Sequence, residues 1–127
     1  MSHSLTLATL PGTFAVARLA ADAPVPGWAW TGELASVTRT REELSIICDD
    51  AAVPAGVAVE PGYRCLRVAG TLVLGLTGIF AALTVPLAAA GIPIFAFSTF
   101  DTDWIMVKAE NLDRAAEALR AAGHIVT

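Results

Sequence analysis

The polar residues best suited to chemistry stand in one short connection in the C-terminal half of the chain. Asp101, Thr102 and Asp103 separate two apolar segments, so a turn between two strands is expected there. Three interpretations are open: a β-hairpin turn that satisfies local backbone groups, a site whose carboxylates face an amino or guanidinium group, or an Asp-x-Asp metal site of nucleotide-sugar chemistry. Taken alone, the pattern favours the hairpin. The metal site is disfavoured because it needs a nucleotide-binding fold and a longer chain.

A second candidate group is Thr77, Gly78 and Ile79, where a helix is expected to begin with Thr77 as its N-cap. Unpaired N–H groups and the positive end of the helix dipole attract anions at such a position. Gly78 would also let a ligand approach the backbone closely. A carboxylate receptor here, together with a carboxylate at Asp101 or Asp103, describes a site for an amino-acid zwitterion.

The sequence carries no recognisable catalytic signature. It has no phosphate-binding G-x-x-x-x-G-K-[ST] or G-x-G-x-x-G motif, and no G-x-S-x-G elbow. His3 and His124 stand near opposite ends of the chain, without metal-ligand spacing. Cys48 and Cys65 each lie in an apolar stretch and are expected to be buried free thiols. We therefore expect no enzyme activity, no cofactor and no metal.

The composition restricts the class of protein and its partners. The 127 residues are 55% hydrophobic and 16% charged, which excludes intrinsic disorder. The net charge is −4 and the eight Lys and Arg are scattered, so nucleic acid is not an expected partner. Between Arg67 and Asp101 there is no charge, but glycines and prolines interrupt this run and flanking cations are lacking. We expect no membrane insertion and, without a signal-peptide pattern, a cytoplasmic location.

Hydrophobic patterning in the C-terminal half predicts the order strand, helix, strand, strand, helix, strand. The expected ranges are 63–69, 79–90, 93–98, 104–108, 112–122 and 124–126. Two helices on one face of a four-stranded antiparallel sheet would form a ferredoxin-like βαββαβ arrangement. The first of these helices contains no charged residue, so burial on more than one side is expected.

The first half of the sequence looks like a reduced copy of the second. Two strand pairs overlay when shifted by sixty positions, 36–40 and 44–48 onto 96–100 and 104–108. Prolines and tryptophans between Leu19 and Leu34 leave room for a short turn in place of a helix. The prediction is an α+β fold of two ferredoxin-like units in tandem, a degenerate one in residues 1–60 and a complete one in residues 61–127.

Several segments resemble the ACT domain superfamily. They are S-T-F-D-T-D-W-I-M-V-K (98–108), E-N-L-D-R-A-A-E-A-L-R-A-A-G-H (110–124), L-T-G-I-F-A-A-L-T-V-P-L-A-A-A-G-I-P-I (76–94) and S-V-T-R-T-R-E-E-L-S-I-I-C (36–48). The resemblance is greatest to small bacterial proteins with two ACT units and to the ACT modules of the animal cytosolic arginine sensor. It implies a regulatory module that binds an amino acid between adjacent ACT units.

The resemblance also implies which residues contact the ligand. The turn at Ser98, Thr99 and Phe100 would offer backbone carbonyls, and Asp103 would pair with the ligand's side chain. The loop before the first helix would meet the ligand's α-carboxylate and α-amino groups. The expected site residues are Ser36, Val37, Thr77, Gly78, Ile79, Ser98, Thr99, Phe100, Asp101 and Asp103. The expected function is an amino-acid-binding regulatory or sensor protein that forms a homodimer. The alternative is a protein-interaction or scaffold module without a small-molecule ligand.

Overall fold

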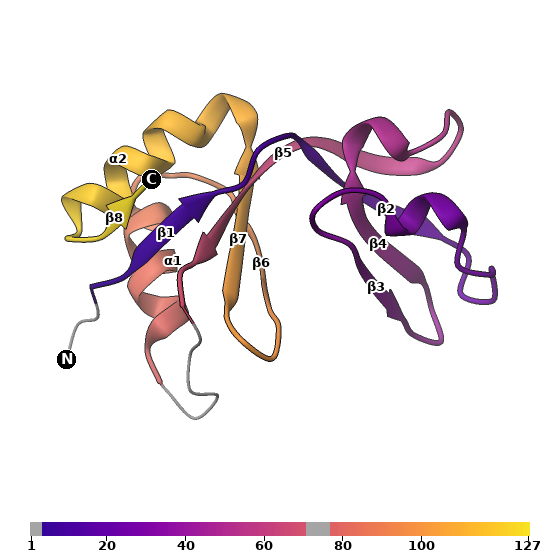
Figure 1. Ribbon diagram of the computed structural model, residues 1–127, viewed down its shortest axis with the longest axis horizontal. Helices are drawn as coiled ribbons and strands as arrows, with labels where there is room; N and C mark the ends of the chain where they lie inside the picture. The colour runs from indigo at the N-terminus through magenta and orange to yellow at the C-terminus, as the bar shows by residue number, and fades with distance from the viewer. Residues whose placement is uncertain (1–3, 71–76) are drawn as a thin grey trace. The chain divides into compact units, whose positions relative to one another are not determined.

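The computed structural model describes residues 4–70 and 77–127, and the chain divides into two compact units (Figure 1). Unit 1 comprises Met1–Pro11 and Arg64–Thr127, and unit 2 comprises Gly12–Tyr63. The division differs from the predicted boundary between residues 60 and 61. The residues up to Pro11 belong with the C-terminal half, so the chain enters and leaves unit 2 as an insertion in unit 1.

In unit 1 the described strands pair in the order β6-β7-β5-β1-β8. These strands are β1 (Thr6–Thr9), β5 (Ala58–Val68), β6 (Phe95–Ser98), β7 (Asp103–Lys108) and β8 (Ile125–Val126). The prediction of a four-stranded antiparallel sheet is therefore incomplete, because it lacks β1. β1 lies between β5 and β8, antiparallel to the first and parallel to the second.

β1 takes this central place because its apolar side chains are buried there and its backbone groups find hydrogen-bond partners. Leu7 is fully buried and pairs with Val68 on one side and Val126 on the other. The backbone N–H of Ile125 donates to Leu5 O at 2.9 Å, and the N–H of Thr127 donates to Leu7 O at 2.9 Å. A buried strand must find partners for all its backbone groups, and β1 finds them in β5 on one side and in β8 on the other.

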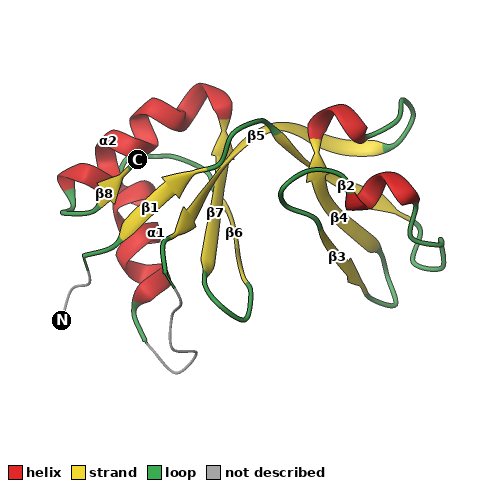
Figure 2. Cartoon of the chain, viewed as in Figure 1, coloured by secondary structure: helices red, strands yellow, loops and turns green. Residues whose placement is uncertain are grey.

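Two helices cover one face of this sheet (Figure 2). α1 spans Ile79–Ala89 and α2 spans Leu112–Ala121, which confirms both predicted helices to within a residue at each end. Their buried side chains form one core with strand residues; the helix members are Leu83, Leu87, Ala115, Ala116 and Leu119. Among the described helices, none is long and apolar enough to cross a bilayer.

The predicted N-cap of α1 is wrong. The N-cap is Gly78, with φ of 81° and no side-chain cap hydrogen bond, and not Thr77. Glycine suits this position because a left-handed backbone costs it nothing sterically. Val85 of α1 is 65% exposed in the single chain. The expected burial of this helix on more than one side stays a prediction.

Unit 2 is built on β2 (Phe14–Leu19), β3 (Ser36–Arg39), β4 (Leu44–Asp49) and the first half of β5, paired in the order β3-β4-β2-β5. A short 3-10 helix, Gly27–Trp30, replaces a full helix, as the sequence predicts. Its Ala29 is packed against Ala17, Leu44, Ile46 and Cys48. The Arg39 guanidinium donates to the carbonyls of Ala21 and Ala23, which fastens the connecting segment to β3.

The two hairpins, β3–β4 and β6–β7, have the same element lengths. Ser36 and Phe95 begin the first strands, and Leu44 and Asp103 begin the second, so 59 positions separate each pair. A 3-10 turn follows each hairpin, at Asp50–Ala52 and at Ala109–Asn111. The predicted offset of sixty is therefore one residue too long.

His124 contacts α1 at the point where Pro86 leaves one helical hydrogen bond unmade. Pro86 lacks an N–H group, so it cannot supply the helical hydrogen bond to the carbonyl four residues earlier, at Ala82. The buried His124 ring fills this gap: its Nε2 lies 2.8 Å from Ala82 O, while Nδ1 accepts the N–H of Leu5 at 3.1 Å. Because Nδ1 is an acceptor, the proton resides on Nε2, which donates to α1.

We expect His124→Ala to destabilise the protein by about 1–3 kcal/mol, because it leaves a buried carbonyl and a backbone N–H without partners. Pro86→Ala restores an N–H that can donate to Ala82, so the loss should be smaller in the Pro86→Ala background. Urea denaturation of the four variants of this double-mutant cycle measures the coupling. Strictly additive effects would show that His124 does not compensate for Pro86.

Candidate functional site

The polar residues between β6 and β7 form a tight hairpin turn. Thr99 donates to Thr102 O twice, through its N–H at 2.9 Å and through its hydroxyl at 3.2 Å. At the base of the turn, the hydroxyl of Ser98 donates to Asp103 Oδ1 at 2.7 Å. The hairpin interpretation is therefore confirmed. A hairpin turn is compatible with a ligand site, because the same hydrogen bonds hold the polar groups of the turn in one conformation.

Thr102 anchors this turn to the sheet. It is only 2% exposed, and its hydroxyl donates to Val68 O, at the end of β5, at 2.7 Å. The connection from β5 to α1 begins at that point. In Figure 1 the turn and the start of α1 both lie at the lower end of unit 1.

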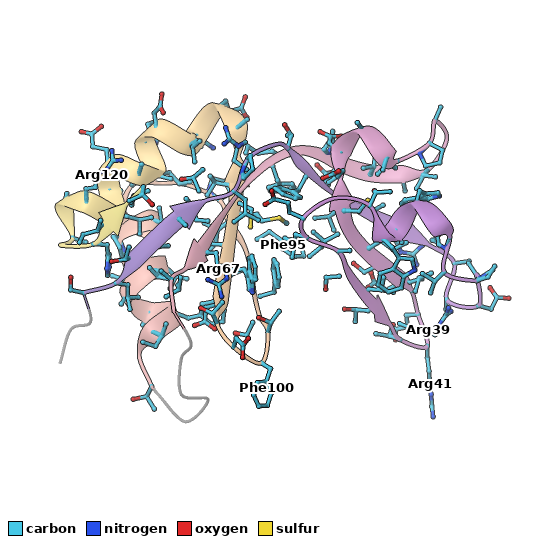
Figure 3. The ribbon with its side chains drawn as sticks, in the orientation of Figure 1. Arg39, Arg41, Arg67, Phe95, Phe100 and Arg120 are labelled. Atoms are coloured by element: carbon cyan, nitrogen blue, oxygen red, sulfur yellow. The ribbon has the colours of Figure 1, made fainter. Side chains whose placement is uncertain are left out.

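The tip of the turn is open to solvent. Phe100 is 79% exposed and its ring points away from the strands (Figure 3). Asp101 is also exposed, whereas Asp103 is half-buried. The turn therefore presents two carboxylates in different environments, one fixed by Ser98 and one at the surface.

An aromatic and cationic stack lies behind the turn. The indole N–H of Trp104 donates to the Thr99 hydroxyl oxygen at 2.8 Å. Its ring stacks on Phe97 with centroids 5.9 Å apart and planes 2° apart, and the Arg67 guanidinium lies 5.5 Å from the ring centroid. Phe97, Trp104 and Arg67 are not among the site residues predicted from the sequence. The sequence could have indicated one contact. If the turn fixes the register of the β6–β7 hairpin, Phe97 must lie opposite Trp104.

The start of α1 supplies backbone rather than side chains. Thr77 and Gly78 are exposed, while the Ile79 side chain is buried. The Gly78 carbonyl accepts the first helical hydrogen bond, from the N–H of Ala82 at 2.9 Å. The predicted loop before the helix lies largely outside the described residues.

The remaining site residues of the prediction lie in unit 2. Ser36 and Val37 are half-buried on β3, where they pair with Ile47 and Ile46 of β4. Their contribution to a pocket shared with the other unit stays a prediction.

The two thiols are buried and unpaired, as predicted. Burial raises the pKa of Cys65 to about 12. Burial, followed by the nearby charges of Asp49 and Asp50, raises the pKa of Cys48. A reactive cysteine needs a lowered pKa, so neither thiol is suited to nucleophilic chemistry at neutral pH. Among the described residues, no three His, Cys, Asp or Glu side chains are grouped to hold a metal ion.

A hollow of about 710 Å³ lies elsewhere in unit 1, beside α2 and β8. Asp113, Glu117 and Arg120 line it together with apolar residues. The Arg120 guanidinium donates to Val126 O at 2.9 Å, which covers the edge of β8.

The sequence matches known proteins in both halves. A family model for the ACT domain matches residues 58–121. The chain belongs to the ACT domain family. A second model, for an N-terminal domain, matches residues 12–56, a range that falls within unit 2. No curated protein sequence matches the chain.

Several solved structures resemble the chain over nearly its full length. A protein from Agobacterium tumefaciens is 38% identical with a TM-score of 0.94, and the match covers 99% of this chain and 94% of that one. A Vibrio cholerae protein of unknown function, described as a possible transport protein, is 20% identical with a TM-score of 0.75 and coverages of 94% and 91%. The ligand-free regulatory subunit of aspartate kinase from Thermus thermophilus is 11% identical with a TM-score of 0.64 and coverages of 91% and 96%. The similarity to the Vibrio cholerae and Thermus thermophilus proteins is a similarity of fold alone.

We expect Thr102→Val to destabilise the ACT domain by about 1–3 kcal/mol, because it keeps the shape but leaves the buried Val68 carbonyl without its donor. The matched control is Thr38→Val, at an exposed position of β3, which should change stability by less than about 0.5 kcal/mol. Chemical denaturation gives both values. Equal effects of the two substitutions would contradict the anchoring role of Thr102.

Stability should also fall in alkali because of Cys65. Its thiol ionises near pH 9.0 when unfolded and near pH 12 when folded, so between these values the unfolded state binds fewer protons. The contribution is fully present below pH 9.0 and is lost, by roughly 1.4 kcal/mol per pH unit, as the pH rises through this window. Denaturation of wild type and Cys65→Ala at several alkaline pH values measures the difference. If the free energies of unfolding of the two proteins changed in parallel with pH, the predicted contribution of Cys65 would be refuted.

Proposed function

We propose that this ACT-domain protein binds an amino acid at the β6–β7 end of unit 1 and acts as a regulatory or sensor protein rather than as an enzyme. The observation that carries the proposal is the fixed turn at that end, which holds the Asp103 carboxylate beside an exposed tip. Its membership of the ACT family supports a regulatory role, as does the shared fold with a regulatory subunit of aspartate kinase.

Asp103 is the group that would receive the positive charge of the ligand. Its Oδ1 accepts the Ser98 hydroxyl, which fixes the orientation of the carboxylate without neutralising its charge. A charge-assisted hydrogen bond from an amino or guanidinium group is about twice as strong as a neutral one. The carbonyls of Thr99 and Phe100 lie at the exposed tip and could accept further N–H groups.

The start of α1 would receive the ligand's carboxylate. The first turn of this helix has N–H groups without helical partners, and its dipole favours an anion there. Gly78 has no side chain to hinder the approach. Thr77, Gly78 and the backbone of Ile79 would therefore complete the zwitterion site that the turn begins.

The wider arrangement follows from the family resemblance. We propose that unit 2 is a degenerate ACT-like unit in tandem with unit 1, and that Ser36 and Val37 close the pocket. The equal lengths of the two hairpins support the tandem interpretation. A ligand related to that of the cytosolic arginine sensor, a cytoplasmic location and a homodimer belong to the same proposal.

A second candidate is an interaction or scaffold module that binds no small molecule. The exposed apolar side chains of Phe100 and Val85 favour it, because large exposed apolar residues are common at protein interfaces. The two functions differ in their response to free amino acids.

Thermal unfolding in the presence of each of the twenty amino acids should identify a stabilising ligand. At 100 times its Kd, a ligand adds about 2.7 kcal/mol of stability, which for a domain of this size raises the Tm by several degrees. No response at millimolar concentrations would contradict the amino-acid site and favour the scaffold. Light scattering with and without the ligand measures the oligomeric state.

With the ligand found, Asp103→Asn should weaken binding about tenfold or more, because it removes the charge while its amide oxygen can still accept from Ser98. Asp101→Asn is the matched control, an exposed carboxylate of the same turn, and should change Kd much less. Calorimetric titration measures both variants. An unchanged Kd in Asp103→Asn would exclude Asp103 from the site.

A further inference from the structure

Trp104 stands directly behind the proposed site and makes contacts that the site does not itself require. It follows Asp103 on β7, and its side chain lies on the sheet face opposite the helices, with Phe97 and Arg67. Its indole N–H reaches forward to Thr99, inside the turn. One side chain therefore joins the rigid sheet to the segment that would touch the ligand.

The hydrogen bond from Trp104 determines the orientation of the Thr99 hydroxyl. That oxygen accepts the indole N–H at 2.8 Å, so its own proton is directed to Thr102 O at 3.2 Å. The Thr99 backbone N–H donates to the same carbonyl. The two ends of the turn are thus held together by a chain of bonds that begins at the indole.

The indole is itself held on both sides. Phe97 lies on the neighbouring strand β6 and stacks on the ring with planes 2° apart. Arg67 lies on β5 and places its guanidinium 5.5 Å from the ring centroid, within range of a cation–π interaction. A side chain fixed by its neighbours can fix a binding group in turn, which is what a preorganised site requires.

We propose that Trp104 is the positioning residue of the amino-acid site: it holds the 99–102 turn in the conformation that binds the ligand, through Thr99. The inference rests on the proposed function, since the turn must bind a ligand for its position to matter. A purely structural tryptophan would contribute to folding stability and leave ligand affinity unchanged.

Trp104→Phe is the informative variant, because phenylalanine retains an aromatic ring between Phe97 and Arg67 but has no N–H donor. We expect the Kd for the amino acid found in the thermal panel to rise about fivefold, the usual effect of one neutral hydrogen bond. Trp28→Phe, the same substitution in the core of unit 2, should leave the Kd within about twofold of wild type. A lower Tm with an unchanged Kd in Trp104→Phe would overturn the proposal.

A double-mutant cycle of Trp104→Phe with Thr99→Val tests whether Trp104 affects ligand affinity through Thr99. Thr99→Val removes the acceptor of the same bond, so Trp104→Phe should weaken binding no further in that background. Independent losses that multiply would show that Trp104 acts by another route, and would also overturn the proposal.

Amide hydrogen exchange provides a readout that needs no ligand. In Trp104→Phe the Thr99 amide should exchange about fivefold faster than in wild type, while amides of β2 and β4 stay unchanged. An unchanged Thr99 rate would refute the positioning role even if an amino acid binds. Faster exchange in the variant, with no response of the wild type to any amino acid, would refute the proposed function and leave Trp104 as a residue that only orders the turn.

Discussion

The pairing of β1 with both β5 and β8 is the constraint on which unit 1 depends. Leu7 brings Val68 and Val126 together across the same buried strand. Without it, the last strand would have no place in the sheet, and His124 could not reach Ala82 of α1. The strand therefore determines where α1 lies, and the start of α1 forms part of the proposed site.

A second constraint acts at the opposite edge of the same sheet. The β6–β7 turn carries polar and aromatic side chains in an exposed position, where a loop would ordinarily be mobile. Two bonds from outside the turn prevent this, one from Thr102 to Val68 and one from Trp104 to Thr99. The proposed site is thus mounted on β5 and β7, whose buried residues form the core of the ACT domain.

The local features of this fold could be predicted from the sequence, and the distant ones could not. α1, α2 and the two hairpins follow from periodicity and from Gly and Pro within a few residues of each end. The strand β1 could not be found in the same way, because it is short and its partner Val126 stands at the other end of the chain. Gly78 displaced Thr77 as the N-cap because a left-handed backbone, which a threonine cap cannot provide, begins the helix.

The candidate site shows the same division. The run from Ser98 to Asp103 was identifiable because its polar residues interrupt an apolar segment. The anchor from Thr102 to Val68 spans 34 positions and leaves no pattern in the sequence. The role of Trp104 was hidden for another reason: aromatic residues in strands usually pack in a core, and only the structure shows the N–H directed at Thr99.

The central position of β1 also imposes an order on biosynthesis. Unit 2 is one continuous segment, Gly12–Tyr63, so its sheet can form while the ribosome is still translating the second half. The sheet of unit 1 is completed later, because β1 pairs with β8 across almost the whole of the described chain, and contacts so distant in sequence form slowly. During that interval the apolar side chain of Leu7 has no permanent cover. Until β8 has been translated, β1 of a nascent chain can pair only with β5, and one edge of β1 stays unpaired.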